Sequence, residues 1–164
     1  MLSHLLIMRH AKSSWDDPEL SDHQRPLNAR GRRAAPAVGH ALTARGYAPD
    51  TIWSSDAKRT RETAMHLIRA FPGAQQVHYF GEMYHAPAEQ MLTLAAQHGE
   101  PGGVERLMWL GHNPGWATLH HYFTGRDHRF PTGACLVLER VGEGDWLEPG
   151  SWRAADLVLP RELE

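Results

Sequence analysis

The 164-residue chain contains a single cysteine, Cys135, so it can form neither an internal disulfide nor a metal site of several thiolates. No apolar run is long enough to span a bilayer, and the short apolar run near the start precedes its basic residues, unlike a secretion signal. The formal net charge of -2 gives no general attraction to nucleic acid or to anionic membranes. We therefore expect a cytoplasmic protein that binds neither membranes nor nucleic acid, and any anion site must be local.

Two further features exclude other classes of protein. The twelve histidines show no His-Glu-x-x-His spacing, so we expect no metal site and no cofactor. The basic string Arg30–Arg33 opens an expected helix and has no interleaved aromatic residues, which favours a solvated helix face over a nucleic-acid contact. Length and an ordinary composition, 41% hydrophobic and 22% charged, favour a single domain over residues 1–164.

Strands and helices are predicted to alternate along the chain. Short apolar runs predict the strands, and apolar residues at helical spacing predict the helices. Asn28 is a good N-cap for the first helix, although Pro36 lies inside it. This alternation predicts a three-layer α/β fold, with a mostly parallel central sheet flanked by helices on both faces and two late strands antiparallel at one edge. The expected strands are 5–8, 51–53, 77–80, 107–110, 134–141 and 154–159, the last two joined by a Gly-rich hairpin at 142–145, and the expected helices are 29–44, 56–70, 87–97 and 114–123.

The first strand ends in Arg9-His10, and this pair organises the functional prediction. Ligands of open α/β sheets bind beyond the carboxyl ends of the strands, where both side chains would stand. A guanidinium offers a planar fork for phosphate oxygens, and a neutral imidazole offers a nucleophilic nitrogen.

Two other strand ends carry similar chemistry. Arg59 lies in the first turn of the helix after the second strand, behind an expected Ser55 or Asp56 cap, where a cation opposes the helix dipole and a bound anion would offset that cost. His112 follows the fourth strand and precedes Asn113-Pro114, a good start for a helix. Two histidines and two arginines at one sheet edge indicate phosphoryl transfer through a phosphohistidine, without a metal.

These residues belong to motifs that resemble the histidine phosphatase superfamily. The branch that the chain most resembles is that of the SixA-type phosphohistidine phosphatases, whose fold is phosphoglycerate mutase-like. The resemblance implies that His10 is the phosphorylated nucleophile and that Arg9, Arg59 and His112 bind the phosphoryl group. The motifs are Arg9-His10-Ala11, residues 25–31 (RPLNARG), residues 54–64 (SSDAKRTRETA), residues 111–115 (GHNPG) and residues 131–134 (PTGA).

Several further positions lie within or near these motifs. Ala11 replaces a glycine of many members, as in the SixA-like branch, and Ser13 aligns with a phosphate-contacting serine of some members. Asp16 stands where phosphoglycerate mutases carry a phosphate-binding asparagine, and receives no binding role because a carboxylate repels phosphate. Glu82 is the candidate general acid, with a solvent-exposed glutamate as the alternative. Trp15 follows the catalytic turn and either lines the pocket or packs elsewhere.

We predict a metal-independent phosphatase with a covalent phosphohistidine intermediate. No insertion is long enough for a lid, so the expected substrate is phosphohistidine on a protein such as a phosphorelay domain. A phosphatase or mutase for a small phosphate ester is the alternative within the enzyme class. A catalytically silent module that binds phosphorylated ligands is the alternative outside it, although binding alone does not need a nucleophile.

Overall fold

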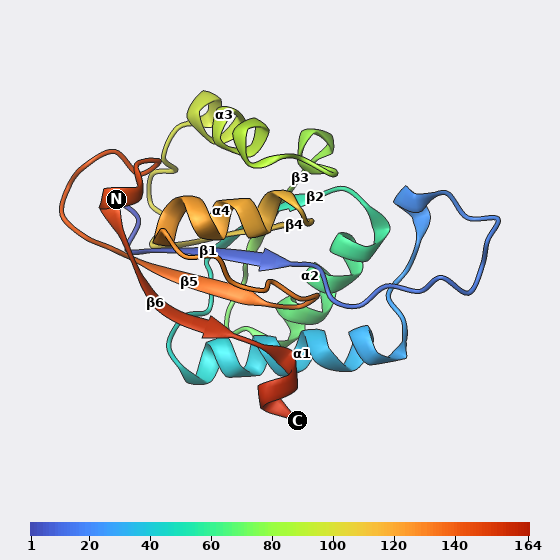
Figure 1. Ribbon diagram of the computed structural model, residues 1–164. Helices are drawn as coiled ribbons and strands as arrows, with labels where there is room; N and C mark the ends of the chain where they lie inside the picture. The colour runs from blue at the N-terminus through green and yellow to red at the C-terminus, as the bar shows by residue number, and fades with distance from the viewer.

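One six-stranded sheet, in the order β3-β2-β4-β1-β5-β6, forms the centre of the molecule (Figure 1). The computed structural model describes residues 1–164. Strands β1 to β4 are mutually parallel, β5 is antiparallel to β1, and β6 is antiparallel to β5. The predicted mostly parallel sheet with an antiparallel edge is therefore confirmed. The strands are β1 (His4–Arg9), β2 (Thr51–Ser55), β3 (Gln76–Phe80), β4 (Arg106–Gly111), β5 (Cys135–Arg140) and β6 (Trp152–Val158).

Helices cover both faces of this sheet, which gives the predicted three layers. Alternate side chains of β1 point to opposite faces: Leu6 and Met8 pack in the core under α1 and α2, whereas Leu5 and Ile7 pack under α3 and α4. Figure 1 shows α1 on one side of the sheet and α3 and α4 on the other. The helices are α1 (Ala29–Ala44), α2 (Lys58–Ala70), α3 (Ala88–His98) and α4 (Gly115–Thr124), with short 3-10 helices η1 (Asp22–Gln24), η2 (Gly81–Met83), η3 (Pro149–Ser151) and η4 (Pro160–Leu163). No helix has both the length and the apolar character that crossing a membrane requires.

The start of α1 agrees with the prediction, and it is anchored to the loop after β1. Asn28 caps the helix, its side-chain oxygen accepting from Gly31 N at 2.8 Å, and the helix continues through Pro36. Only glycine fits at position 31, because a Cβ there would lie 2.1 Å from the carbonyl oxygen of Lys12. Asn28 N donates to the same carbonyl at 3.0 Å. The first turn of α1 is thereby held against the segment that follows β1.

Some boundaries differ from the predictions. Helix α2 begins at Lys58 with Ala57 at the cap position, not Ser55 or Asp56, because Ser55 still pairs with β3 and the chain needs two more residues to turn. Helix α4 begins one residue later than expected, with Pro114 at the cap position, and Asn113 instead accepts from Ala117 N at 3.1 Å. Strand β6 begins at Trp152, so the connection from β5 includes η3 as well as the predicted Gly-rich turn.

Candidate active site

The carboxyl ends of β1, β2 and β4 meet at one edge of the sheet, as the sequence motifs predicted. Arg9 is in register with Gly111, and His10 N donates to the Gly111 carbonyl at 3.0 Å. Beyond this edge lies an open cavity of about 320 Å³. We call it the catalytic cavity; its lining residues are Arg9, His10, Lys12, Ser13, Trp15, Asp22, Arg25, Arg59, His85, His112, Asn113 and Thr132.

His10 is buried, with 5% of its surface exposed, and its ring has a fixed orientation. Its Nδ1 lies 2.6 Å from the Ala11 carbonyl oxygen, which can only accept, so Nδ1 carries the ring proton. Burial lowers the pKa of His10, and the nearby arginine charges lower it further. The hydrogen bond to Ala11 opposes them, and the resulting pKa is about 3. At neutral pH the ring is uncharged, and Nε2 keeps a free lone pair.

Two further hydrogen bonds from other segments hold the turn that carries His10. Ala11 N donates to Thr63 Oγ1 of α2 at 3.1 Å, and Gly133 N donates to the His10 carbonyl at 2.8 Å. Thr63 also donates to the Arg59 carbonyl at 2.7 Å, so one hydroxyl links the His10 turn to the first turn of α2. These bonds place the imidazole relative to the arginines before any substrate arrives, which is the preorganisation that phosphoryl transfer needs.

His112 faces His10 with 5.3 Å between the ring centroids. Its Nε2 lies 2.8 Å from Ser55 Oγ, and the same oxygen accepts from Ala57 N at 3.2 Å. The tautomer in which the Ser55 hydroxyl donates to His112 Nε2 places the proton of the ring on Nδ1, a buried atom without a partner in the chain. Burial is the main cause that lowers the pKa of His112, and the Arg59 charge lowers it further. A neutral ring with a free N–H can donate to a phosphoryl oxygen.

Arg9 and Arg59 both reach the cavity with donors to spare. Arg9 Nη1 donates to the Phe130 carbonyl at 3.2 Å, and the buried Nε atoms of both arginines have no partner. Burial lowers the pKa of Arg9, and the charge of Arg59 lowers it further. Both effects disfavour the charged guanidinium, and a bound anion would counteract them. The Arg59 side chain is only 3% exposed although it lies in the first turn of α2.

Asp22 provides the countercharge for Arg59, a role that no sequence motif predicted. Its carboxylate accepts from Arg59 Nη2 at 3.0 Å, from Arg25 Nε at 3.1 Å and from the Tyr84 hydroxyl. His85 Nε2 lies 3.0 Å from the same carboxylate. Burial alone would raise the pKa of Asp22, but the bonds from Tyr84 and Arg59 outweigh it and hold that pKa well below its usual range. Asp22 is thus an ionised positioning group.

The chain offered little signal for Asp22 and His85. Asp22 lies in a polar stretch that predicted only a loop, and it reaches the cavity because η1 folds that loop back. His85 lies in the short connection between η2 and α3 and belongs to none of the sequence motifs. It is the single non-glycine residue with a positive φ, 52°, a conformation that often marks functional positions but that no sequence pattern predicts.

Ser13 and Trp15 also lie at the cavity, in contact with Arg25. Ser13 Oγ accepts from Arg25 Nη1 at 2.7 Å, so the serine positions an arginine as well as lining the cavity. The Trp15 ring stacks on Arg25 with 3.5 Å between the guanidinium carbon and the ring centroid. Trp15 is 75% exposed, which makes it an aromatic surface at the rim of the cavity.

Glu82 and Asp16 lie outside the catalytic cavity. Glu82, the expected general acid, is exposed in η2 and does not line the cavity, which corrects the expectation of a partly buried acid beside the phosphate site. The reason is geometric: η2 turns the chain so that Met83 is buried, Tyr84 reaches Asp22, and Glu82 points to solvent. Asp16 is exposed, in agreement with giving it no binding role.

The balance of charge in the catalytic cavity favours a polyanion. Four cationic side chains, from Arg9, Lys12, Arg25 and Arg59, surround one carboxylate, that of Asp22. No group of three or more His, Cys, Asp or Glu side chains in the chain is arranged to hold a metal ion. The guanidinium and imidazole groups that line the cavity can supply donors for a phosphoryl group beside a neutral nucleophile.

Known proteins resemble this chain in both sequence and fold. The sequence profile described as the histidine phosphatase superfamily (branch 1) matches residues 5–107. An uncharacterized chloroplastic protein of Arabidopsis thaliana is 33% identical over 170 residues, covering 95% of this chain and 77% of that protein. An uncharacterized protein of Mycobacterium tuberculosis is 31% identical over 165 residues, covering 94% of this chain and 100% of that protein.

Among solved structures, a candidate SixA phosphohistidine phosphatase from Agrobacterium tumefaciens superimposes with a TM-score of 0.82 and 32% identity, covering 98% of this chain and 99% of that one. The matched profile, the relatives over nearly the whole length and the shared fold lead to one conclusion: this chain belongs to the histidine phosphatase superfamily, in its SixA-type branch.

Proposed function

We propose that this protein is a phosphohistidine phosphatase that works through a covalent phosphohistidine on His10. Membership of the superfamily supports phosphatase activity. The observation that carries the mechanism is the hydrogen bond of 2.6 Å from His10 Nδ1 to the Ala11 carbonyl. It fixes the tautomer in which Nε2 is unprotonated, inside a cavity with three guanidinium groups.

The reaction has two steps that share one phosphoryl site. His10 Nε2 attacks phosphorus, the new P–N bond forms, and the bond from phosphorus to the leaving group breaks with its electron pair on that group. Arg9, Arg59 and His112 Nδ1 donate to the phosphoryl oxygens as charge spreads over them. A water molecule then attacks phosphorus, the bond to His10 breaks, and phosphate leaves with the neutral imidazole restored.

What each kind of leaving group requires from the cavity favours phosphohistidine as the substrate. An alkoxide leaving group needs a proton from an acid, but the cavity holds no protonated carboxyl: Asp22 stays ionised and Glu82 lies outside. A phosphoimidazole whose second nitrogen is protonated leaves as neutral imidazole and needs no acid. The open cavity, without a lid, admits a side chain displayed on a folded phosphoprotein.

A small phosphate ester is the second candidate substrate, and the size of the catalytic cavity supports it. About 320 Å³ lies at the lower end of the range of small-molecule sites, so a compact ester fits the space. A protein that only binds phosphorylated ligands is the third candidate, but a preorganised free imidazole nitrogen serves no purpose in binding alone.

The test compares kcat/KM for a phosphohistidine-bearing phosphorelay domain, phosphoserine and sugar phosphates at one pH. We expect the phosphohistidine protein to give the highest value and His10→Ala to abolish turnover, because no other residue of the turn is an activated nucleophile. A phosphoenzyme trapped by rapid quenching should be labile in acid and stable in alkali, as a phosphoramidate is.

Each part of the proposal can fail separately. Near-normal turnover by His10→Ala would eliminate the covalent mechanism. A small ester preferred by about tenfold or more, roughly 1.4 kcal/mol of transition-state binding, would replace the substrate and leave the mechanism standing. Binding of phosphohistidine protein without any turnover would favour the silent module.

A further inference from the structure

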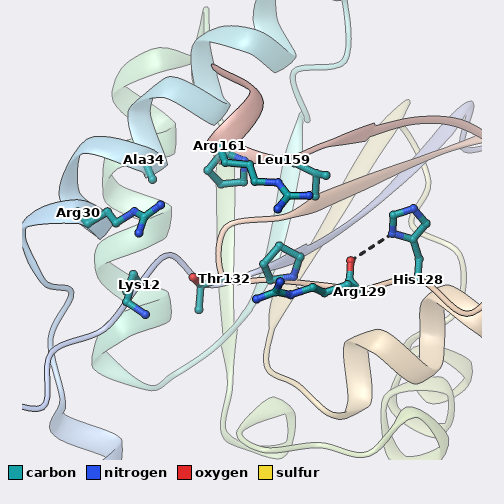
Figure 2. A pocket seen from close by; sticks show the side chains of 10 residues that line it. Lys12, Arg30, Ala34, His128, Arg129, Thr132, Leu159 and Arg161 are labelled. Atoms are coloured by element: carbon teal, nitrogen blue, oxygen red, sulfur yellow. Dashed lines mark hydrogen bonds between the residues drawn. The ribbon is translucent and has the colours of Figure 1, made fainter. Parts of the chain in front are cut away.

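A second cavity adjoins the catalytic cavity and carries an unusual concentration of positive charge. It measures about 280 Å³, and Lys12 and Thr132 line both this space and the catalytic cavity, so the two lie next to each other. Figure 2 shows Lys12 and Arg30 on one side of the space and Arg129 and Arg161 on the other. We call it the basic groove; its charged members are Lys12, Arg30, Arg129 and Arg161, with His128 at one end.

The charges of the basic groove have almost no countercharge within the protein. No aspartate or glutamate lines it, although the chain as a whole has a net charge of -2. Arg30 approaches Glu164 at 3.7 Å, and the side chains of Lys12, Arg129 and Arg161 form no ion pair. These four cations come from the β1 loop, α1, the loop before β5 and η4. Their mutual repulsion is a cost that a bound anion would offset.

We propose that the basic groove is a docking subsite for carboxylate side chains that flank the phosphorylated residue of a protein substrate. This inference rests on the proposed function, because the groove would take the acidic neighbours of the same residue whose phosphoryl group enters the catalytic cavity. The shared edge at Lys12 and Thr132 makes it possible for one substrate to occupy both cavities.

The state of the side chains favours carboxylates over a second phosphate. In the catalytic cavity, Arg59 and Arg9 are held by Asp22 and by the Phe130 carbonyl, which suits one phosphoryl group of fixed geometry. In the basic groove, Arg129 and Arg161 are exposed and donate no hydrogen bond to the protein. Exposed cations without fixed partners suit several carboxylates whose positions vary, and they steer the encounter of an acidic surface.

The experiment measures binding and turnover with two synthetic peptides. Both carry one histidine site, flanked by glutamates in one peptide and by glutamines in the other. For the dissociation constants the site is a non-hydrolysable phosphohistidine analogue, and for kcat/KM it is phosphohistidine. The wild type should bind the glutamate peptide about fivefold more tightly at low salt, and the preference should shrink as ionic strength rises.

Two variants of equal charge separate the groove from general electrostatics. Arg129→Gln with Arg161→Gln should remove the preference for the glutamate peptide. The control, Arg69→Gln with Arg126→Gln, removes the same charge from exposed positions outside both cavities and should keep the preference and the activity.

The outcomes distinguish this inference from the proposed function. Equal affinity of the wild type for both peptides, or a preference that survives in Arg129→Gln/Arg161→Gln, would overturn the docking subsite. A groove-dependent preference for a small bisphosphate over a monophosphate, with none between the peptides, would overturn the assignment to a protein substrate. Tight, glutamate-dependent binding without turnover of phosphohistidine would support the groove and count against the proposed function alone.

Discussion

The catalytic cavity and the basic groove lie side by side and are both cationic, but they hold their charges differently. In the catalytic cavity Arg59 is 3% exposed, paired with Asp22, and shares its helix turn with the hydroxyl that fixes the His10 loop. In the basic groove Arg129 and Arg161 lie in solvent without a fixed partner. Buried, oriented charge stabilises a transition state strongly, whereas exposed charge of the same sign contributes little energy and mainly attracts.

The contrast also explains why Asp22 belongs in a site that binds an anion. A buried guanidinium without a countercharge is costly, so a carboxylate beside Arg59 keeps the empty cavity stable. The carboxylate uses one edge of the guanidinium, and Nε remains without a partner. The basic groove needs no such carboxylate because water already solvates its cations. Removing charge from the two regions should therefore have very different consequences.

Among the changes that remove charge from the two regions, the largest expected effect comes from Arg59. Arg59→Ala should lower kcat/KM by about 10²–10³-fold for every substrate, because one preorganised donor to the phosphoryl group is lost. Arg59→Lys should recover only part of the rate, since an ammonium cannot contact Asp22 and two phosphoryl oxygens as a planar fork does. Steady-state kinetics with a small ester and with a phosphohistidine peptide measures both.

Arg161→Gln alone is the matched change in the basic groove. Its effect should be several-fold at most, confined to acidic substrates and reduced by salt. The distinction between the two regions would break if Arg59→Ala were no more harmful than Arg161→Gln, and Arg59 would then be no more than a structural arginine.

A smaller effect should appear in the dependence of stability on pH. The pKa of His10 and that of His112 lie below the unfolded value of about 6.5, so the unfolded chain takes up protons that the folded protein does not as pH falls below that value. The free energy of unfolding should therefore decrease from pH 7 towards pH 4, by up to about 1.4 kcal/mol per pH unit for each histidine. Above pH 7 neither ring contributes a slope.

Denaturant unfolding at several pH values can assign this slope to the catalytic cavity. His112→Gln removes one buried ring and should flatten the slope. The matched control is His128→Gln, which removes a histidine from an exposed position of the basic groove and keeps both rings of the catalytic cavity. An identical slope in the wild type and in His112→Gln would show that burial of this ring does not limit acid stability.

The same contrast marks what sequence can and cannot predict here. His10, Arg9, Arg59 and His112 were predictable because each stands at the end of a strand, directly after one or in the first turn of a helix. Parallel strands bring those positions together. Asp22 was not, because a loop of about eighteen residues carries no periodicity that states where its middle folds back. Glu82 was misplaced for a related reason: a 3-10 turn after β3 decides which of three adjacent side chains faces inward.

The remaining differences were small shifts at element ends, and they follow from competition between neighbouring elements. Ser55 has the side chain of a helix cap, yet the strand retains it, and it then binds His112 from there. The basic groove is the extreme case. Its four cations come from four separate segments, so only the folded chain shows that they share one space.

The smallest expected effect concerns metal ions. If guanidinium and imidazole groups supply all the charge that faces the phosphoryl oxygens, exhaustive chelation should leave kcat/KM unchanged in the wild type, and vanadate should inhibit as a mimic of five-coordinate phosphorus. Loss of activity on chelation, with recovery on adding Zn²⁺ or Mg²⁺, would mean that the cations of the catalytic cavity do not suffice. That result would remove the central difference between the two regions, because the arginines around His10 would then act as those of the basic groove do, by attracting the substrate and not by stabilising its transition state.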